Sequence, residues 1–348
     1  MRVPVEKLRA FMQESAEALP MDHSYAQVMV DNLITASLWG IDSHGVNRYP
    51  VYMNRLHKNS VNRTPNITIK HTFPAAISVD GDNGLGSVIM LRALEESMKA
   101  ADTYGISVAA IKSGNHVGAV GYYCDMAARK GYVTVMFAVA PANMPPYGGM
   151  ETYFGTNPIS IGIPCPDGQH IIVDIATSVA AKGKVRNAAR KGEPIPEGWA
   201  IDKDGNPTTD AQAAIDGLML PFAAHKGSAL ALVVECFAGV MSGSAFGKDI
   251  IMQWGDDPRP ADVGHFFITF KPESFMPIED YNARILRFCS ELRAIKPAKG
   301  FEKVILPGEA ERIAAKAVIE DGIEIDDTLA KQFEEIAELV GRKVPWGH

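Results

Sequence analysis

Hydrophobic residues recur at helical spacing near both ends of the chain. Apolar positions three and four residues apart predict amphipathic helices over residues 1–20 and 24–39, and a short helix over 52–56. The second helix is expected to begin with a capping box at Ser24 and Gln27 and to stop at Gly40. Two further helices are predicted over residues 309–320 and 327–340.

Strand and helix patterns alternate between these helical ends. Predicted strands cover residues 75–79, 106–111, 132–140, 160–164, 171–175, 265–270 and 304–306. Predicted helices cover residues 87–104, 119–130, 227–241 and 278–294. Such alternation indicates βαβ units and a mostly parallel sheet with covering helices.

Three details qualify this pattern. Pro166-Asp167-Gly168 is turn chemistry, so the strands on either side of it are expected to pair as a hairpin. Residues 192–211 are rich in Gly, Pro and Asp and predict an ordered surface excursion. The segment 227–241 is apolar almost all round, which predicts a buried helix.

Composition narrows the functional classes. The chain has 348 residues, of which 47% are hydrophobic and 22% charged, so we expect a soluble globular protein with a sizeable core. The net charge of −7, without any basic block, argues against nucleic acid or an anionic membrane as a partner. A small-molecule substrate is the expectation.

The cysteines and the most apolar window indicate a cellular compartment. Four widely spaced cysteines in a long chain without a signal peptide predict free thiols rather than disulfides. The window 229–240 is too short and too interrupted to cross a bilayer. We therefore expect a cytoplasmic protein.

The segment from Gly40 to Pro50 carries the first candidate chemistry. His44 and Arg48 follow a predicted helix end, on a loop of the kind that commonly carries catalytic side chains. Histidine exchanges a proton near neutral pH, and arginine binds a carboxylate through two parallel hydrogen bonds, so the pair suits chemistry on an organic acid. Taken alone, a loop histidine is more often structural.

Two glycine-containing loops follow predicted strands and precede helices. Ser113–Gly118, which contains His116, could hold a phosphate on free amides or be only a tight turn. Gly81–Gly86 has glycines at its first, fourth and sixth positions, whereas the dinucleotide fingerprint needs the first, third and sixth. Its glycines are interpreted as turn residues.

Three more motifs could contact a ligand. Gly155–Pro158 offers a hydroxyl and an amide, although a structural turn is equally plausible. Asp174–Ser178 could hold ribose oxygens or only cap a helix. Lys226 opens a helix whose positive end would favour an anion, or it is simply exposed.

Metal and serine-hydrolase chemistry fit poorly. The histidines are scattered, and no His-x-x-x-His or Cys-x-x-Cys pair is present, so no metal site is expected. No Gly-x-Ser-x-Gly elbow follows a strand, which argues against a serine hydrolase. Ser43 directly precedes His44 in sequence, and this makes a hydrogen-bonded attack pair of the two side chains unlikely.

In order and spacing, these motifs resemble the malate/L-lactate dehydrogenase family of type 2, also called the L-sulfolactate dehydrogenase-like family. The resemblance spans nearly the whole chain and includes Gly198–Asp202, Pro207–Asp210 and Leu306–Glu309. It implies a non-Rossmann α/β fold, with a mixed sheet, flanking helices and helical terminal segments. It also implies an NAD- or NADP-dependent dehydrogenase and a homodimer with sites at the subunit interface.

The resemblance implies roles for single residues and for regions. By resemblance, His44 corresponds to the proton donor of the family and Ser43 to the residue that orients it. His116 corresponds to a second candidate acid or base, and Arg48 to the residue that binds the substrate carboxylate. The implied substrate contacts are Thr156 and Asn157, and the implied cofactor contacts are Asp174, Ile175, Ala176, Lys226, Leu306, Pro307 and Gly308. We expect residues 1–70 to pack with 309–348, and residues 71–308 to form an α/β region with a helical insertion around 178–260.

Several alternatives stay open at this point. The family includes enzymes of malate, lactate, sulfolactate, ureidoglycolate, diketogulonate and cyclic imino acids. Ser228 stands where many relatives have tyrosine, which leaves a sugar-derived or imine substrate possible. No basic cluster decides between NAD and NADP. A silent binding protein and a metal-dependent hydrolase are the alternatives from other classes.

Overall fold

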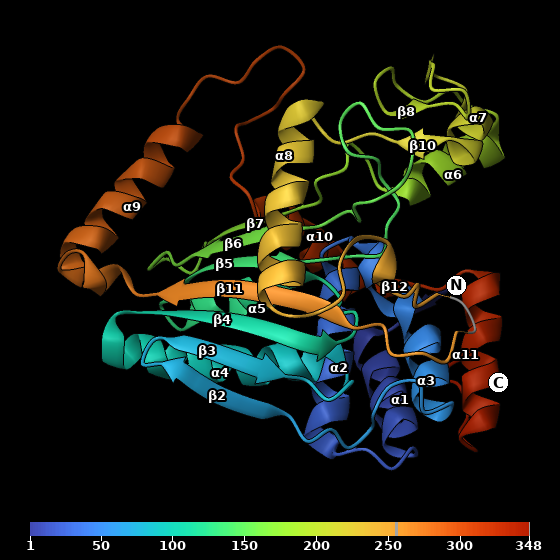
Figure 1. The fold of residues 1–348 in the computed structure, drawn as a ribbon, viewed down its shortest axis with the longest axis horizontal. Helices are drawn as coiled ribbons and strands as arrows, with labels where there is room; N and C mark the ends of the chain where they lie inside the picture. The colour runs from blue at the N-terminus through green and yellow to red at the C-terminus, as the bar shows by residue number, and fades with distance from the viewer. Residues whose placement is uncertain (255–256, 348) are drawn as a thin grey trace.

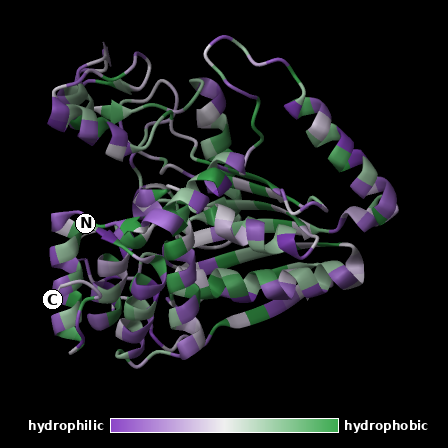
Figure 2. Ribbon diagram, turned by 180° about the vertical axis from the view of Figure 1, so that it is seen from behind, coloured by the Kyte–Doolittle hydropathy of each residue, from purple (hydrophilic) through white to green (hydrophobic). Residues whose placement is uncertain are grey.

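A seven-stranded mixed sheet with the order β2-β3-β4-β11-β5-β6-β7 organises the computed structural model, which describes residues 1–254 and 257–347 (Figure 1). The strands are β2 (Thr68–Phe73), β3 (Ala76–Asp80), β4 (Ile106–Gly114), β11 (Val263–Phe270), β5 (Val133–Ala138), β6 (Ile159–Ile163) and β7 (Ile171–Ile175). Figure 2 shows hydrophobic residues concentrated in these strands.

The sheet is mixed, as the resemblance implies. The prediction of a mostly parallel sheet, made from the alternation of strand and helix patterns, is wrong. Only β3 and β4 pair in parallel, whereas every other neighbouring pair is antiparallel. Strand β11 comes from late in the sequence and lies between β4 and β5. An insertion of this kind cannot be seen in the local alternation of helices and strands.

Helices cover both faces of the sheet. On one face, α4 (Gly86–Tyr104) and α5 (Val120–Arg129) bury Ile89, Tyr123 and Phe267. On the other, α8 (His225–Val234) continues as a π-helical segment, Glu235–Met241, that packs on Phe266. The predicted hairpin is present as antiparallel β6 and β7.

The expectation that residues 227–241 are buried all round is wrong for the single chain. Leu232 is 52% exposed, and Val240 and Met241 are each 55% exposed. One apolar face of α8 and its π-helical continuation therefore faces outward.

Both ends of the chain build a second core beside the sheet. The helices involved are α1 (Val5–Glu17), α2 (His23–Leu38), α3 (Tyr49–His57), α10 (Glu309–Asp321) and α11 (Asp327–Leu339). Strand β1 (Arg2–Val3) pairs with β12 (Ile323–Glu324), and the rings of Tyr49 and Phe333 stack with centroids 5.5 Å apart. The proposed division of the chain into regions stays a prediction.

Helix α2 (His23–Leu38) begins two residues earlier than the capping-box pattern predicts. Asp22 is its N-cap, and the Asp22 carboxylate accepts a hydrogen bond of 2.8 Å from the Ser24 amide. Ser24 already lies inside the first turn, so the predicted capping box is wrong. The predicted stop is present, because α2 ends at Leu38 and Gly40 has a φ of +74°.

An ordered lobe includes the surface excursion predicted over residues 192–211 and extends beyond it at both ends. It contains α6 (Lys182–Lys191), β8 (Ala200–Ile201), β9 (Pro207–Thr208), α7 (Ala211–Asp216) and β10 (Leu218–Met219). The three short strands form one sheet, and Val185, Ile195 and Ala214 lie in the core of the lobe. Helix α9 (Ile278–Arg293) follows β11, and the strand predicted over residues 304–306 is wrong because that segment has no regular secondary structure.

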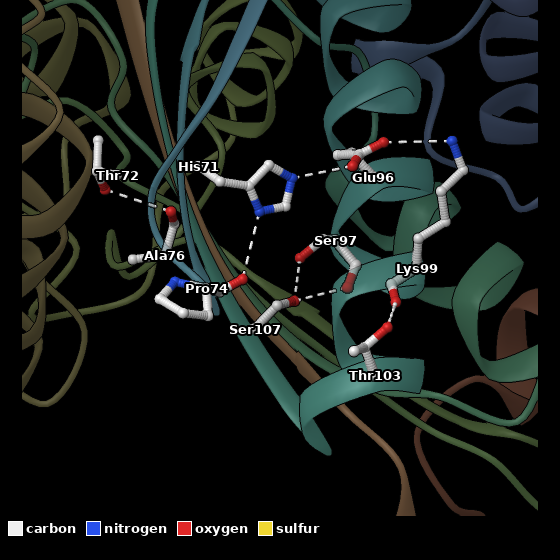
Figure 3. A network of polar contacts seen from close by, with 9 residues as sticks. All are labelled: His71, Thr72, Pro74, Ala76, Glu96, Ser97, Lys99, Thr103 and Ser107. Atoms are coloured by element: carbon white, nitrogen blue, oxygen red, sulfur yellow. Dashed lines mark hydrogen bonds and ion pairs between the residues drawn. The ribbon is translucent and has the colours of Figure 1, made fainter.

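Polar contacts fasten the edge of the sheet to α4, as Figure 3 shows. The ring of His71 on edge strand β2 lies 2.9 Å from the Glu96 carboxylate on α4. Beneath the helix, the hydroxyls of Ser97 and Ser107 lie 2.5 Å apart. No described helix is both long and apolar enough to cross a membrane.

His265 lies fully buried on β11, and neither ring nitrogen has a side-chain hydrogen-bond partner within residues 1–254 and 257–347. Burial lowers its pKa to about 4. The unfolded chain, with a histidine pKa of about 6.5, therefore takes up this proton first as the pH falls. Stability is lost as the pH drops from 6.5 toward 4.

We predict that His265→Leu removes this pH dependence. Between pH 7 and pH 5, the wild type should lose about 2 kcal/mol of unfolding free energy relative to the variant. Urea unfolding at the two pH values measures the difference, with the exposed His57→Leu as the control. An equal loss in wild type and His265→Leu would contradict the prediction.

Candidate active site

Two consecutive 3₁₀ turns, Asp42–His44 and Val46–Arg48, connect α2 to α3. Their junction is pressed onto α2, because a Cβ atom at Gly45 would lie 2.1 Å from the Ser37 hydroxyl oxygen. That hydroxyl accepts a hydrogen bond of 3.0 Å from the Val46 amide. The predicted loop is thus a rigid turn that carries both His44 and Arg48.

The second histidine lies on the loop between β4 and α5. The Asn115 side chain donates to the Gly84 carbonyl at 2.8 Å, and a Cβ atom at Gly86 would lie 2.3 Å from the Asn115 carbonyl oxygen. The Asp262 carboxylate accepts from the Ser113 amide at 3.0 Å. Close backbone packing therefore explains the glycines of the 81–86 turn and fixes His116.

The structure brings the two histidines together. Their rings stack at 25° with centroids 5.2 Å apart. Nδ1 of His44 lies 2.9 Å from the Ser43 hydroxyl. Nδ1 of His116 accepts from the Gly118 amide at 3.2 Å and lies 2.5 Å from the Tyr52 hydroxyl. Since its Nδ1 is an acceptor, neutral His116 carries its proton on Nε2.

Arg48 completes the cluster. Its Nε donates to the Ser43 carbonyl at 2.5 Å, and its guanidinium carbon lies 4.0 Å from the centre of the Trp254 ring. The same indole contacts the edge of His116, with ring centroids 4.9 Å apart. Arg48 has no carboxylate partner in the part of the chain that the structure describes.

The cluster holds both histidines neutral at pH 7. Burial, and then the positive charge of Arg48, lower the pKa of His44 to about 4. Burial, His44 and Arg48 lower the pKa of His116 well below its usual range. An anion bound to Arg48 would offset its charge and raise both pKa values. The site therefore takes up a proton more readily when an acid is bound.

Thr156 and Asn157 lie beside α8 rather than in this cluster. Both Asn157 amide hydrogens are used, one by the Ala231 carbonyl at 3.1 Å and one by the Glu235 carboxylate at 2.5 Å. The Thr156 carbonyl accepts from the Thr177 amide at 2.8 Å. These bonds give Asn157 a supporting role for α8, and its contact with substrate stays a prediction.

Asp174 and Gly308 line a common pocket at the end of β7. The residues around it include Trp39, Ile41, Ile172, Asp174, Gly308 and Arg312. The Asp174 carboxylate accepts from the Gly121 amide at 2.8 Å, and burial raises its pKa to about 6. Nε and Nη2 of Arg312 are buried without hydrogen-bond partners among the described residues. The pocket therefore offers two unsatisfied donors of Arg312, and its lining also includes Arg129 and the carboxyl groups of Asp125, Asp174 and Glu311.

The other expected cofactor residues lie in different surroundings. Leu306 is buried, and the Pro307 carbonyl accepts from the Ile172 amide at 3.2 Å, which fastens this segment to β7. Ile175 is 45% exposed, and Ala176 is exposed beside it. Lys226 is exposed in the first turn of α8. No hydrogen bond among the described residues joins it to the histidine cluster or to the pocket at the end of β7.

Sequence reasoning missed Tyr52, Gln253 and Trp254. Tyr52 lies one helical turn after Arg48, so its spacing could have placed it on the same side as Arg48, although the contact with His116 carries no local signal. Gln253, whose side chain accepts from the His116 amide at 2.9 Å, and Trp254 come from far along the chain, where no local pattern points to His116. No group of three His, Cys, Asp or Glu residues in the described ranges could hold a metal ion.

We predict that Arg48→Gln raises the pKa of His44 while leaving it below 6.5, because burial, the larger cause, remains. An NMR titration of the imidazole signals measures this, with His44 assigned from the His44→Gln spectrum. The surface substitution Arg63→Gln is the control and should change nothing. An unchanged His44 titration in Arg48→Gln would disprove the coupling.

The comparisons with known proteins cover nearly the whole chain. A family profile described as malate/L-lactate dehydrogenase matches residues 3–334. A malate/(S)-sulfolactate dehydrogenase from Methanothermus fervidus is 32% identical over 99% of this chain and 100% of its own length. An NAD(+)-dependent ureidoglycolate dehydrogenase from Escherichia coli is 31% identical over 94% of each chain. The structure of the sulfolactate dehydrogenase from Methanocaldococcus jannaschii superposes with a TM-score of 0.94 and 34% identity, covering 99% of this chain and 98% of that one.

Proposed function

The chain belongs to the malate/L-lactate dehydrogenase family, and from that premise we propose that it interconverts a small 2-oxo acid and its 2-hydroxy acid through the cluster of His44, His116 and Arg48. It is an oxidoreductase that uses NAD or NADP. The observation that carries the proposal is the stacked pair of neutral imidazoles beside an arginine without a carboxylate partner among the described residues.

The pocket beside β7 fits part of a nicotinamide dinucleotide. Its unsatisfied Arg312 donors suit phosphate or ribose oxygens, and the Asp174 carboxyl suits a ribose hydroxyl. We propose that Asp174, Ile175 and Ala176, together with Leu306, Pro307 and Gly308, hold the cofactor, and that Lys226 contacts it from α8. When bound, the cofactor supplies or accepts the hydride.

The residues of this chain supply alignment, charge and the proton. Arg48 binds the substrate carboxylate, and its charge is then balanced, which raises the pKa of the neighbouring imidazoles. His44 donates its proton to the 2-oxo oxygen in reduction and accepts it back in oxidation. Ser43 orients His44, and Tyr52 and the Gly118 amide hold the His116 ring.

We predict that His44→Gln lowers kcat for reduction by about 10²- to 10⁴-fold, the usual range for losing a general acid. Cofactor affinity should change little, because His44 lies in the turn and not in the β7 pocket. His116→Gln is the comparison variant and should lose less activity. The measurement is NADH and NADPH oxidation with a panel of 2-oxo acids, sugar-derived oxo acids and cyclic imines. If His44→Gln keeps nearly full activity and His116→Gln loses it, His116 rather than His44 is the proton donor.

The substrate alternatives from the resemblance are reductions of cyclic imino acids or diketogulonate and the oxidation of ureidoglycolate. Ser228 is the residue that left cyclic imino acids and diketogulonate possible as substrates. Its hydroxyl accepts a hydrogen bond of 2.9 Å from the Tyr147 amide, so it has a partner inside the fold. Ser228 therefore gives no specific reason to favour these substrates over a 2-oxo acid.

We propose a cytoplasmic homodimer with sites at the subunit interface. The outward apolar face of α8 and its continuation is the reason for the dimer, because apolar patches of this kind usually mark protein contacts. Its exposed members are Leu230, Leu232, Val233, Val240 and Met241. The four cysteines are free, which is usual in reducing compartments.

We predict that Leu232→Glu shifts the protein from dimer to monomer, because burying the new carboxylate in an apolar interface is costly. Light scattering after size-exclusion chromatography measures the mass. Tyr104→Glu, at an exposed tyrosine on the end of α4, is the control and should stay dimeric. A monomeric wild type, or a Leu232→Glu variant with the wild-type mass, would contradict the proposed interface.

A further inference from the structure

His116 has two hydrogen-bond partners at one ring nitrogen, Nδ1. This nitrogen lies 3.2 Å from the Gly118 amide nitrogen and 2.5 Å from the Tyr52 hydroxyl oxygen. A backbone amide can only donate, so Nδ1 must accept from Gly118 and cannot carry a hydrogen itself. The Tyr52 hydroxyl, which could donate or accept, is therefore a second donor to Nδ1.

The surroundings of Tyr52 and His116 keep this arrangement in place. Tyr52 is only 6% exposed, and burial raises the pKa of its hydroxyl, so the hydroxyl keeps its hydrogen. The charged or titratable neighbours that lower the pKa of His116 are His44, Arg48 and His265, and no carboxylate among the described residues opposes them. His116 is thus a neutral imidazole whose one hydrogen is on Nε2.

Nε2 of His116 is available to a ligand. It donates to no described residue, and it is not one of the buried atoms that lack a partner. The Gln253 side chain accepts from the His116 backbone amide at 2.9 Å, and the Trp254 ring contacts the imidazole with centroids 4.9 Å apart. These contacts fix the direction of the Nε2–H bond.

His44, which stacks on His116 at 5.2 Å between ring centroids, is held in a different way. Its Nδ1 lies 2.9 Å from the Ser43 hydroxyl oxygen. A hydroxyl can rotate, so it accepts from a protonated Nδ1 as well as it donates to a bare one. His44 can therefore take up a second proton and keep this bond, whereas a second proton on His116 would point at the Gly118 N–H.

We propose that His116 is a fixed hydrogen-bond donor to the 2-oxo oxygen, held in the Nε2–H form by Tyr52 and the Gly118 amide, and that Tyr52 is a positioning residue of the reaction. The inference rests on the proposed function, which brings the 2-oxo acid to this site. In reduction the oxygen takes its new proton from His44, which returns to its neutral form, and the hydride comes from the cofactor. The hydrogen on Nε2 of His116 stays in place and stabilises the negative charge that develops on the oxygen.

The first test is nitrogen-15 NMR of the ligand-free protein with labelled histidines, in which the His116 signals are assigned from the His116→Gln spectrum. We expect His116 to carry its hydrogen on Nε2 alone at neutral pH. Tyr52→Phe should move the Nδ1 signal toward that of a ring nitrogen without a hydrogen bond, because one donor is lost.

Tyr49→Phe is the matched control for Tyr52→Phe. It removes a second buried hydroxyl from the same helix, α3, but this hydroxyl donates to the Met12 carbonyl at 2.6 Å and does not contact His116. The control should leave the Nδ1 signal unchanged. A hydrogen on Nδ1 of wild-type His116, or an unmoved Nδ1 signal in Tyr52→Phe, would overturn the inference whatever the enzyme reduces.

The second test is the pH dependence of kcat for reduction of a 2-oxo acid. Since reduction consumes the proton of His44, kcat should fall as the pH rises through the pKa of His44 in the substrate complex. His116→Gln has an amide that can donate but cannot titrate, so it should lower kcat and keep this fall. Tyr52→Phe should also keep it and lower kcat by about 2- to 10-fold, the net value of one hydrogen bond, with KM little changed.

The kinetic outcomes separate the inference from the proposed function. If 2-oxo acids are reduced but His116→Gln abolishes the fall of kcat with pH, His116 titrates in the reaction, and the inference is wrong while the proposed function stands. Wild-type kcat in Tyr52→Phe would also remove Tyr52 from the account. If no 2-oxo acid is reduced at all, the proposed function fails and the inference fails with it.

Discussion

The antiparallel insertion of β11 between β4 and β5 is the constraint on which the rest of the structure depends. It joins the β2-β3-β4 half of the sheet to the β5-β6-β7 half. Because β11 begins at Val263, the residues just before it reach the end of β4. Asp262 thereby holds the Ser113 amide, and Trp254 lies against Arg48 and His116. The sheet topology thus assembles the site from segments that are far apart in sequence.

The charges around His44 and His116 determine which protonation states the site can adopt. Burial and the positive charge of Arg48 keep both imidazoles neutral. An acid that balances the charge of Arg48 raises the pKa of His44, so that its imidazole takes up a second proton more readily. Binding and proton transfer are therefore linked through a single charge. Such coupling favours reaction when the correct anion is present, because without it the imidazoles are neutral and are weaker acids than imidazolium.

Local pattern predicted most of the elements but not how they pair. The helices near His44 and the β6-β7 hairpin were predictable, because their spacing and turn residues are local signals. The parallel arrangement was wrong because β11 pairs across a long sequence separation. Of the site, the motifs around His44, Arg48 and His116 pointed to chemistry, whereas Trp254 and Gln253 carried no signal at all. Asn157 and Ser228 show the reverse case, in which a suggestive polar residue has its partners inside the fold.

The central claim is that this cluster holds a 2-oxo acid and protonates its carbonyl oxygen, while the nicotinamide cofactor would supply the hydride to the carbonyl carbon. Reduction of a 2-oxo acid with cofactor deuterated at C4 of the nicotinamide, followed by NMR of the product, tests it most directly. The account predicts deuterium on C2 of the 2-hydroxy acid for one face of the nicotinamide, with the hydroxyl proton coming from solvent. Product whose C2 hydrogen derives from water, whichever face is labelled, would contradict it.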